Sequence, residues 1–98
     1  MSDASHQVAQ IYDSAEWTQA LATDYDVSAQ ALFVNCKQPD YVIIRTDTSM
    51  TVKFNSASNP PITINANTAF ELKLKIYSMF ITTTGSSAVK VVLTESTP

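Results

Sequence analysis

The chain has 98 residues, which is enough for one domain with one hydrophobic core. Hydrophobic residues make up 45% of the chain and charged residues only 15%, a balance that excludes intrinsic disorder. The formal net charge is −3: residues 1–30 hold five acids and no base (−5), and residues 31–98 hold six bases and four acids (+2). Because neither part has the basic stripe that nucleic-acid binding requires, we expect no nucleic-acid partner.

The first 15 residues form an acidic leader with few apolar side chains. Val8, Ile11, Tyr12 and Ala15 have helical spacing, so the leader is either a short amphipathic helix or an extended arm that docks on a neighbour. Tyr12 and the following Trp17 are aromatic residues that can each bury on the order of 150–250 Å². We therefore divide the chain into an N-terminal arm (1–15) and a β-sandwich domain (16–98) that folds without the arm. The expected protein-interface residues are Val8, Ile11, Tyr12 and Trp17.

Short strands are predicted along most of the remaining chain. The first covers 17–22, with Trp17, Gln19 and Leu21 on one side, and an apolar run predicts a second at 31–36. Residues 47–49 are short enough to be a hairpin loop, and the prolines in 56–61 indicate a longer loop. The other strands are predicted at 41–46, 50–55, 62–64, 70–76, 79–84 and 89–94.

The segment 70–76 gives the clearest pattern. With a period of two, its apolar residues fall on one face, while Glu71, Lys73 and Lys75 fall on the other. A half-buried strand places all three charges in water, whereas a helix would scatter them around its axis. The same reasoning leaves Lys53 exposed and predicts the core residues Val52, Phe54, Phe70, Leu72, Leu74, Ile76, Ile81, Val91 and Leu93.

Turn residues support this interpretation. Gly85 is the only glycine, so asparagine must supply other backbone positions with positive φ. Asn55, Asn59, Asn65 and Asn67 all lie at predicted strand ends. Seven to eight short strands at 8–12 residue spacing predict an all-β fold, an antiparallel β-sandwich of jelly-roll type with an N-terminal arm.

Few residues of the chain are candidates for catalysis or metal binding. His6 is the only histidine and lies in the leader, and Cys36 ends an apolar run, where a buried structural thiol is expected. Asp24 and Asp26 have the Asp-x-Asp spacing of a calcium loop but lack its glycine and its distal glutamate. We therefore predict no enzyme activity, no catalytic residues, no metal site and no cofactor. An aromatic patch for sugar or protein remains an alternative, built from Trp17, Tyr12, Tyr25, Tyr41 and Tyr77.

Redox and targeting features are also simple. A single cysteine excludes an internal disulfide, and the sequence begins without the basic and apolar regions of a signal peptide. No apolar run approaches membrane-spanning length. We expect synthesis in a reducing cytosol and no membrane partner.

Residues 25–95 resemble the small all-β virion proteins of tailed bacteriophages and of phage-derived gene transfer agents. The shared pattern begins with a polar turn, Asp24-Tyr25-Asp26-Val27, and an Ala-Leu-Phe-Val-Asn run at 31–35. It continues with Asp40-Tyr-Val-Ile-Ile-Arg, Met50-Thr-Val-Lys-Phe, an Asn-Ala-Asn-Thr turn at 65–68, Phe70-Glu-Leu-Lys-Leu-Lys-Ile, and the run from Met79 to Leu93. The resemblance covers about three quarters of the chain, and the scarcity of glycine and the longer leader depart from it.

The resemblance implies a structural role in the virion and no catalytic residues. The implied function is binding to the capsid exterior as a decoration, cement or spike-base subunit. The implied partners are the major capsid protein or another virion protein, together with further copies of the chain. Because the charged residues are few, we expect a homo-oligomer with rotational symmetry, a trimer first and a pentamer second. A tail or baseplate component and a carbohydrate- or receptor-binding module are the alternatives.

Overall fold

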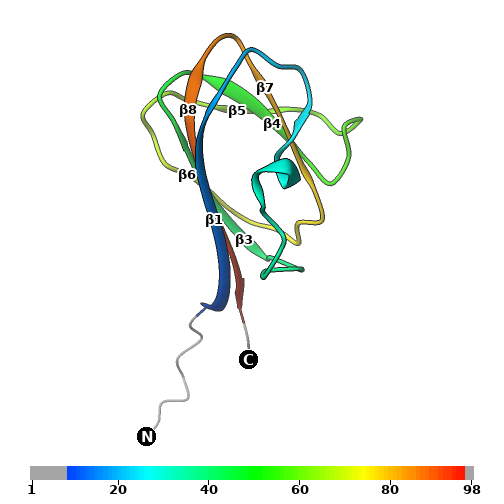
Figure 1. Ribbon diagram of the computed structural model, residues 1–98. Coiled ribbons are helices and arrows are strands. Elements are labelled where there is room, and N and C mark those ends of the chain that lie inside the picture. The colour runs from blue at the N-terminus through cyan, green and yellow to red at the C-terminus, as the bar shows by residue number, and fades with distance from the viewer. Residues whose placement is uncertain (1–8, 97–98) are drawn as a thin grey trace, which may run out of the picture.

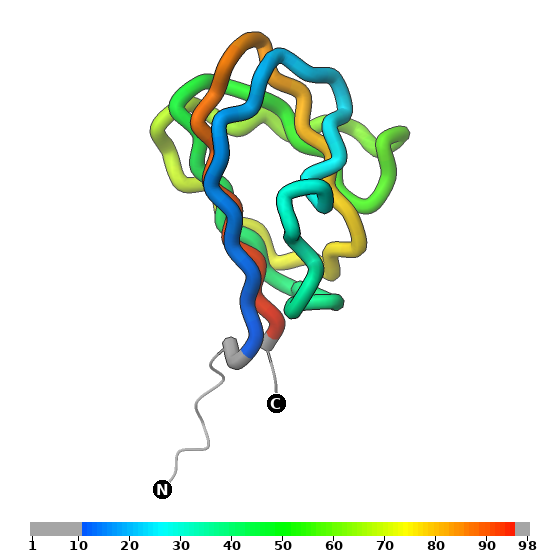
Figure 2. The backbone as a smooth tube through the Cα atoms, in the orientation of Figure 1, coloured from blue at the N-terminus to red at the C-terminus, as the bar shows by residue number. Residues whose placement is uncertain are grey.

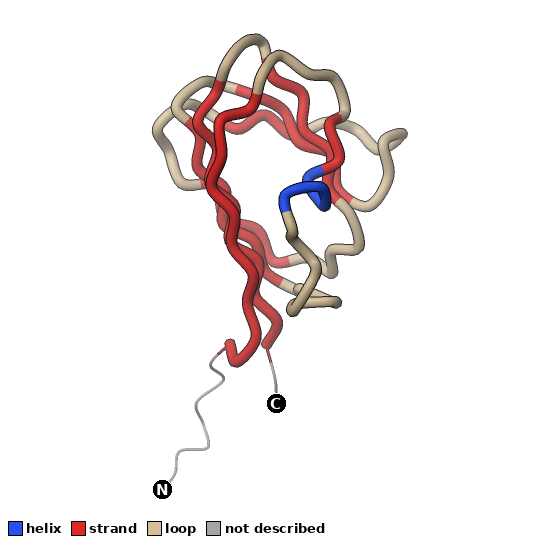
Figure 3. The backbone as a smooth tube through the Cα atoms, viewed as in Figure 1, coloured by secondary structure: helices blue, strands red, loops and turns tan. Residues whose placement is uncertain are grey.

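The computed structural model describes residues 9–96, and it is an all-β protein, as predicted (Figures 1 and 3). Eight strands are joined by loops and by one short 3-10 helix, η1, which follows β2 directly. The elements are β1 (Ala9–Gln19), β2 (Tyr25–Asp26), η1 (Val27–Gln30), β3 (Tyr41–Thr46), β4 (Met50–Phe54), β5 (Ile62–Ile64), β6 (Phe70–Lys73), β7 (Met79–Thr83) and β8 (Ser87–Ser96).

The strands form two four-stranded antiparallel sheets, which we call sheet A and sheet B. Sheet A has the order β1-β8-β3-β6 and sheet B the order β2-β7-β4-β5. Neither sheet is closed, so each has two edge strands. Every connection between successive strands passes from one sheet to the other, except the one between β4 and β5.

The hairpin predicted at 47–49 is therefore wrong, because β3 lies in sheet A and β4 in sheet B. The Thr46 hydroxyl donates to the carbonyl oxygen of Thr48 at 2.9 Å and tightens the turn. Thr46 and Met50, which flank the turn, are both buried. Sequence alternation shows that both strands have a buried face, but it does not show that these faces belong to different layers.

One hydrophobic cluster contains the buried side chains of both sheets. Of the nine predicted core residues, Phe70 and Leu72 are partly buried and Leu74 is 38% exposed, so the prediction is wrong for Leu74. Strand β6 ends at Lys73, one residue before Leu74, and it lies at the edge of sheet A. The six fully confirmed core residues are Val52, Phe54, Ile76, Ile81, Val91 and Leu93.

The three lysines that the sequence predicts to be exposed differ in their observed exposure. Lys73 and Lys75 are exposed, as predicted, but the alternation holds only over Phe70–Lys73, where β6 ends. Lys53 is only partly exposed, and its ammonium lies 3.2 Å from the Asp24 carboxylate. Exposure was predicted for all three, and Lys53 differs because a turn before β2 places an acid beside it.

The strand predicted at 31–36 is also wrong. Here η1 leads into a series of turns in which Ala31 and Phe33 have φ angles of 63° and 68°. Leu32 and Cys36 are buried, while Val34 between them is 54% exposed. The apolar run therefore supplies core residues from an irregular loop, whose backbone N–H groups at Asn35 and Cys36 donate to a side chain instead of to a neighbouring strand.

Asparagine supplies part of the positive-φ backbone, as predicted. Asn55 and Asn67 have φ angles of 70° and 59°, whereas Asn59, Asn65 and Gly85 do not adopt positive φ. The Asn55 side chain also accepts the N–H of Tyr77 at 2.6 Å and donates to the carbonyl of Lys75 at 3.0 Å. Asn55 therefore closes the end of β4 against the segment after β6.

Strand β1 gives the leader its structure from Ala9 onward. It pairs with β8 from Ala9 opposite Ser96 to Gln19 opposite Ser87. Figure 2 shows these two strands, blue and red, side by side. The strand crosses the expected boundary between residues 15 and 16 without a break, so residues 9–15 are extended and not helical. It ends at Gln19, and Leu21, predicted to be in this strand, lies beyond it and is 72% exposed.

Candidate functional site

The outer edge of β1 is the longest strand edge in the described chain that lacks a backbone partner. No described residue outside β8 forms a backbone-to-backbone hydrogen bond with this 11-residue strand. The other edge strands, β6, β2 and β5, have four, two and three residues. Short edges are one way in which proteins prevent unwanted pairing, and long unpaired edges are templates for another strand.

The side chains of β1 alternate between solvent and core. Tyr12, Ser14, Glu16 and Thr18 are exposed on the outer face of sheet A, and Tyr12 is 64% exposed. Ile11 follows the inward set but lies at the end of the strand and is 36% exposed. Strand β1 therefore offers an unpaired edge with two accessible apolar residues at one end.

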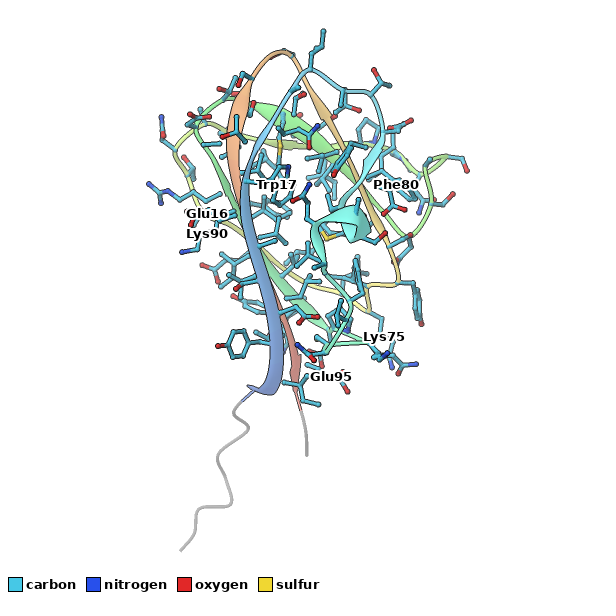
Figure 4. All side chains as sticks on the ribbon, in the orientation of Figure 1. Glu16, Trp17, Lys75, Phe80, Lys90 and Glu95 are labelled. Carbon is cyan, nitrogen blue, oxygen red and sulfur yellow. The ribbon has the colours of Figure 1, made fainter. Side chains whose placement is uncertain are left out.

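These positions can be compared with the predicted interface set. Ile11 and Tyr12 are accessible on β1, and Val8 lies outside the described residues. Trp17 packs against the core, and its indole N–H donates to Oε1 of Gln19 at 2.8 Å. Figure 4 shows Trp17 directed between the sheets and Glu16 on the opposite face. The indole thus has a role inside the domain, whereas Tyr12 has none that the structure shows.

Asp13 is the residue that sequence reasoning missed. Its carboxylate is buried and accepts hydrogen bonds from the backbone N–H of Asn35 at 3.0 Å, the side-chain amide of Asn35 at 3.1 Å and the backbone N–H of Cys36 at 2.9 Å. These contacts hold the 31–36 loop against β1. The sequence signal for its burial is that Asp13 has the same strand parity as Ala15 and Trp17. The helical spacing of apolar residues in the leader obscures this signal.

Cys36 has the environment of a structural thiol. Its side chain is fully buried, and burial raises the pKa of the thiol to about 11, with further contributions from the carboxylates of Glu95, Asp13 and Asp40. The thiolate is the nucleophilic form of cysteine, so this thiol is unreactive at neutral pH. His6 lies outside the described residues, and residues 9–96 contain no group of three potential metal ligands.

The aspartates of the suggested calcium spacing have separate structural roles. Asp24 forms the ion pair with Lys53, and Asp26 accepts the backbone N–H of Ser28 at 3.0 Å to cap η1. The candidate aromatic patch is also divided. Tyr25 packs against the core, and the hydroxyl of Tyr41 donates to Glu71, which raises the pKa of Tyr41. Tyr77 is 61% exposed.

A small hollow of about 190 Å³ lies where the turns before β4 and β6 approach β1 and β8. In the sheet register, Lys90 lies opposite both Glu16 and Arg45, so one acid and two bases form a row across three strands. Asp47 is held by the backbone N–H of Ala88 at 2.8 Å. The hollow therefore combines both signs of charge with the amide of Asn67, which also lines it.

No protein-family model matches the chain, and no curated protein matches its sequence. Across residues 9–96, no helix has the length and apolarity needed to cross a bilayer.

Proposed function

We propose that this chain is a non-enzymatic virion structural protein of a tailed bacteriophage that binds the capsid exterior as a decoration, cement or spike-base subunit. The observation that carries the proposal is the 11-residue edge strand β1, whose outer side has no described backbone partner. An added strand gains main-chain hydrogen bonds along such an edge, and side chains beside it set specificity. Ile11 and Tyr12 are the accessible apolar side chains that a partner would cover.

The strand orders support a jelly-roll sandwich as the finer description of the fold. Sheets of order β1-β8-β3-β6 and β2-β7-β4-β5, with the chain crossing between them at every connection but one, are what an eight-stranded double Greek key produces. Jelly rolls form many viral capsid domains and also lectins. The fold is therefore compatible with the virion role, and the free edge of β1 is the feature that favours it over other jelly-roll functions.

Particle binding is the direct test. Purified protein is mixed with capsids of the phage that encodes it, and co-sedimentation and electron microscopy measure occupancy and position. Binding to the head supports decoration, and binding only to tails supports a baseplate component instead. Tyr12→Asp should weaken particle binding because it places a charge where an apolar contact is needed. Leu21→Asp makes the same kind of change at an exposed residue outside the strands and should leave binding unchanged. Absence of the protein from purified particles would contradict the proposal.

A carbohydrate-binding module is the second candidate, and the hollow beside Lys90 is the observation that favours it. Arg45, Lys90 and Asn67 provide hydrogen-bond donors around one small concavity. A glycan array probed with the wild-type protein and with Arg45→Ala tests this candidate. Selective hits that disappear in the variant would support it, and an array without hits would contradict it.

A further inference from the structure

We propose that copies of this chain join through sheet A, with the β1 edge of one copy paired antiparallel to the β6 edge of the next. All neighbouring strands of sheet A are antiparallel, and the sheet has four strands, so its edges β1 and β6 run in opposite directions. A copy rotated about an axis along the strands therefore presents β6 to β1 in antiparallel orientation. Repetition of this heterologous contact closes a ring when the rotation from one copy to the next divides a full turn. This inference deepens the proposed function, on which its biological role rests: the strand added at the β1 edge is the neighbour's β6, and Tyr12 on the outer face of sheet A is left for the capsid.

The second edge, β6, is open in the same sense as β1. Its residues pair with β3, and the following Leu74 and Ile76 donate to the carbonyls of Asp40 and Pro39 on that same side. No described backbone group bonds to its other side. Two unpaired edges at opposite ends of one sheet are the arrangement that a head-to-tail assembly uses.

One register matches the two edges face by face. With Glu16 opposite Lys73 of the neighbour, both on the solvent face, Trp17 lies beside Leu72 on the core face. Ala15 then meets Leu74, the predicted core residue that is 38% exposed in the single chain. A shift by one residue would place core-facing side chains against solvent-facing ones, so parity excludes odd shifts. Among the even shifts, Glu16 opposite Glu71 would pair like charges, and Glu16 opposite Lys75 would lie beyond the end of β6.

Charge distinguishes this contact from pairing of two β1 strands. Strand β1 contains two acids and no base, and Asp13 is already bonded within the chain. Neither Glu16 nor Lys73 forms an ion pair with a described residue. A neighbour's β6 offers Lys73 to Glu16, whereas a second β1 offers no cation. Opposite charges directly across an antiparallel pair stabilise it, and like charges destabilise it.

A charge-swap series on the full-length chain tests the contact. Wild-type protein, Glu16→Lys, Lys73→Glu and the double variant are compared by sedimentation velocity and native mass spectrometry across a concentration range. Each single variant places like charges at both contacts of every subunit, so its apparent dissociation constant should rise roughly tenfold. The double variant should restore the wild-type mass. Lys37→Glu makes the same charge change in the exposed 31–40 loop and should assemble normally.

Circular dichroism first confirms that each protein is folded. Three outcomes would then overturn the proposal: a wild-type chain that is monomeric at high micromolar concentration, a Lys73→Glu variant that assembles as the wild type does, and a double variant that assembles no more tightly than the single variants. The second of these, together with a defective Glu16→Lys, would indicate pairing of β1 with another partner. Particle binding is measured in a separate experiment. If the wild-type protein binds capsids but the variants assemble as the wild type does, the proposed contact is wrong and the proposed function still stands.

Discussion

The Asp13 carboxylate accepts the backbone N–H of Cys36 at 2.9 Å, across 23 residues of sequence. Asp13 lies on the edge strand β1, and Cys36 lies in the irregular loop that follows η1. The bond joins the two segments that sequence patterns describe least well. It explains how a loop with no ladder of its own places Leu32 and Cys36 in the core.

Asp13→Ala should destabilise the domain by roughly 2–4 kcal/mol, because it leaves the N–H groups of Asn35 and Cys36 without their acceptor. The decrease in the free energy of unfolding is measured by urea titration. Ser14→Ala, on the exposed face of the same strand, is the matched control and should change stability by less than about 0.5 kcal/mol. Equal stabilities for the two variants would show that the carboxylate does not hold the loop.

How far the sequence predicts this protein depends on whether a strand is regular. In β4, β7 and β8, alternation places the predicted side chains in the core, because a half-buried strand has only one register that buries its apolar set. Alternation does not show which strands share a sheet. The short loop at 47–49 therefore predicts a hairpin, although β3 and β4 lie in different sheets. It also fails at 31–36, where backbone hydrogen bonds go to a side chain distant in sequence.

Sequence patterns alone do not distinguish Tyr12 from Trp17 at the candidate site. Tyr12 is accessible and Trp17 is turned inward, although both are large aromatic residues in one polar segment, because a strand sends positions of opposite parity to opposite faces. The free edge itself has no sequence signature. Whether a strand is central or at an edge depends on the order of the sheet, which long-range pairing decides.

Core substitutions should follow the observed burial. Ile44→Ala removes a fully buried side chain from a central strand and should cost about 2–5 kcal/mol. The sequence predicts a similar cost for Leu72→Ala, but Leu72 is only partly buried at an edge, so a smaller loss is now expected. Chemical denaturation of both variants measures the order. A larger loss for Leu72→Ala would mean that β6 is covered, as it would be in an assembled ring.

Asn55 should tolerate glycine better than alanine. Its φ of 70° costs an alanine roughly 1–2 kcal/mol and a glycine little, while both substitutions lose the side-chain bonds to Tyr77 and Lys75. Thermal melts of Asn55→Gly and Asn55→Ala separate the backbone effect from the side-chain effect. The same pair of substitutions at Asn59, which lacks positive φ, should not favour glycine.

Removing the leader should have a different effect from the one that the sequence predicts. A chain starting at Ser14 loses the first five residues of β1, Asp13 among them, which pair with the end of β8. It should melt well below the full chain, and a chain starting at Ala9, which keeps all of β1, is the control. Similar melting temperatures for the full chain and the chain starting at Ser14 would support the sequence-based prediction that the domain folds without residues 1–15.

Stability should fall at alkaline pH through Cys36. The folded protein holds the thiol proton more tightly than the unfolded chain, because burial raises the pKa of Cys36 from 9.0 to about 11. The contribution of the neutral thiol is therefore complete below about pH 9 and is lost as the pH rises through 11. The loss approaches roughly 2–3 kcal/mol, since each pKa unit corresponds to about 1.4 kcal/mol.

Urea titrations of the wild type and Cys36→Ala at pH 7, 9, 10 and 11 measure this effect. All other ionisable groups are common to both proteins, so the difference between the two curves isolates the thiol. Cys36→Ala should be less stable at pH 7, because it leaves a small cavity, and the two proteins should converge as the pH approaches 11. A constant difference at all four pH values would show that the thiol does not ionise on unfolding in this range.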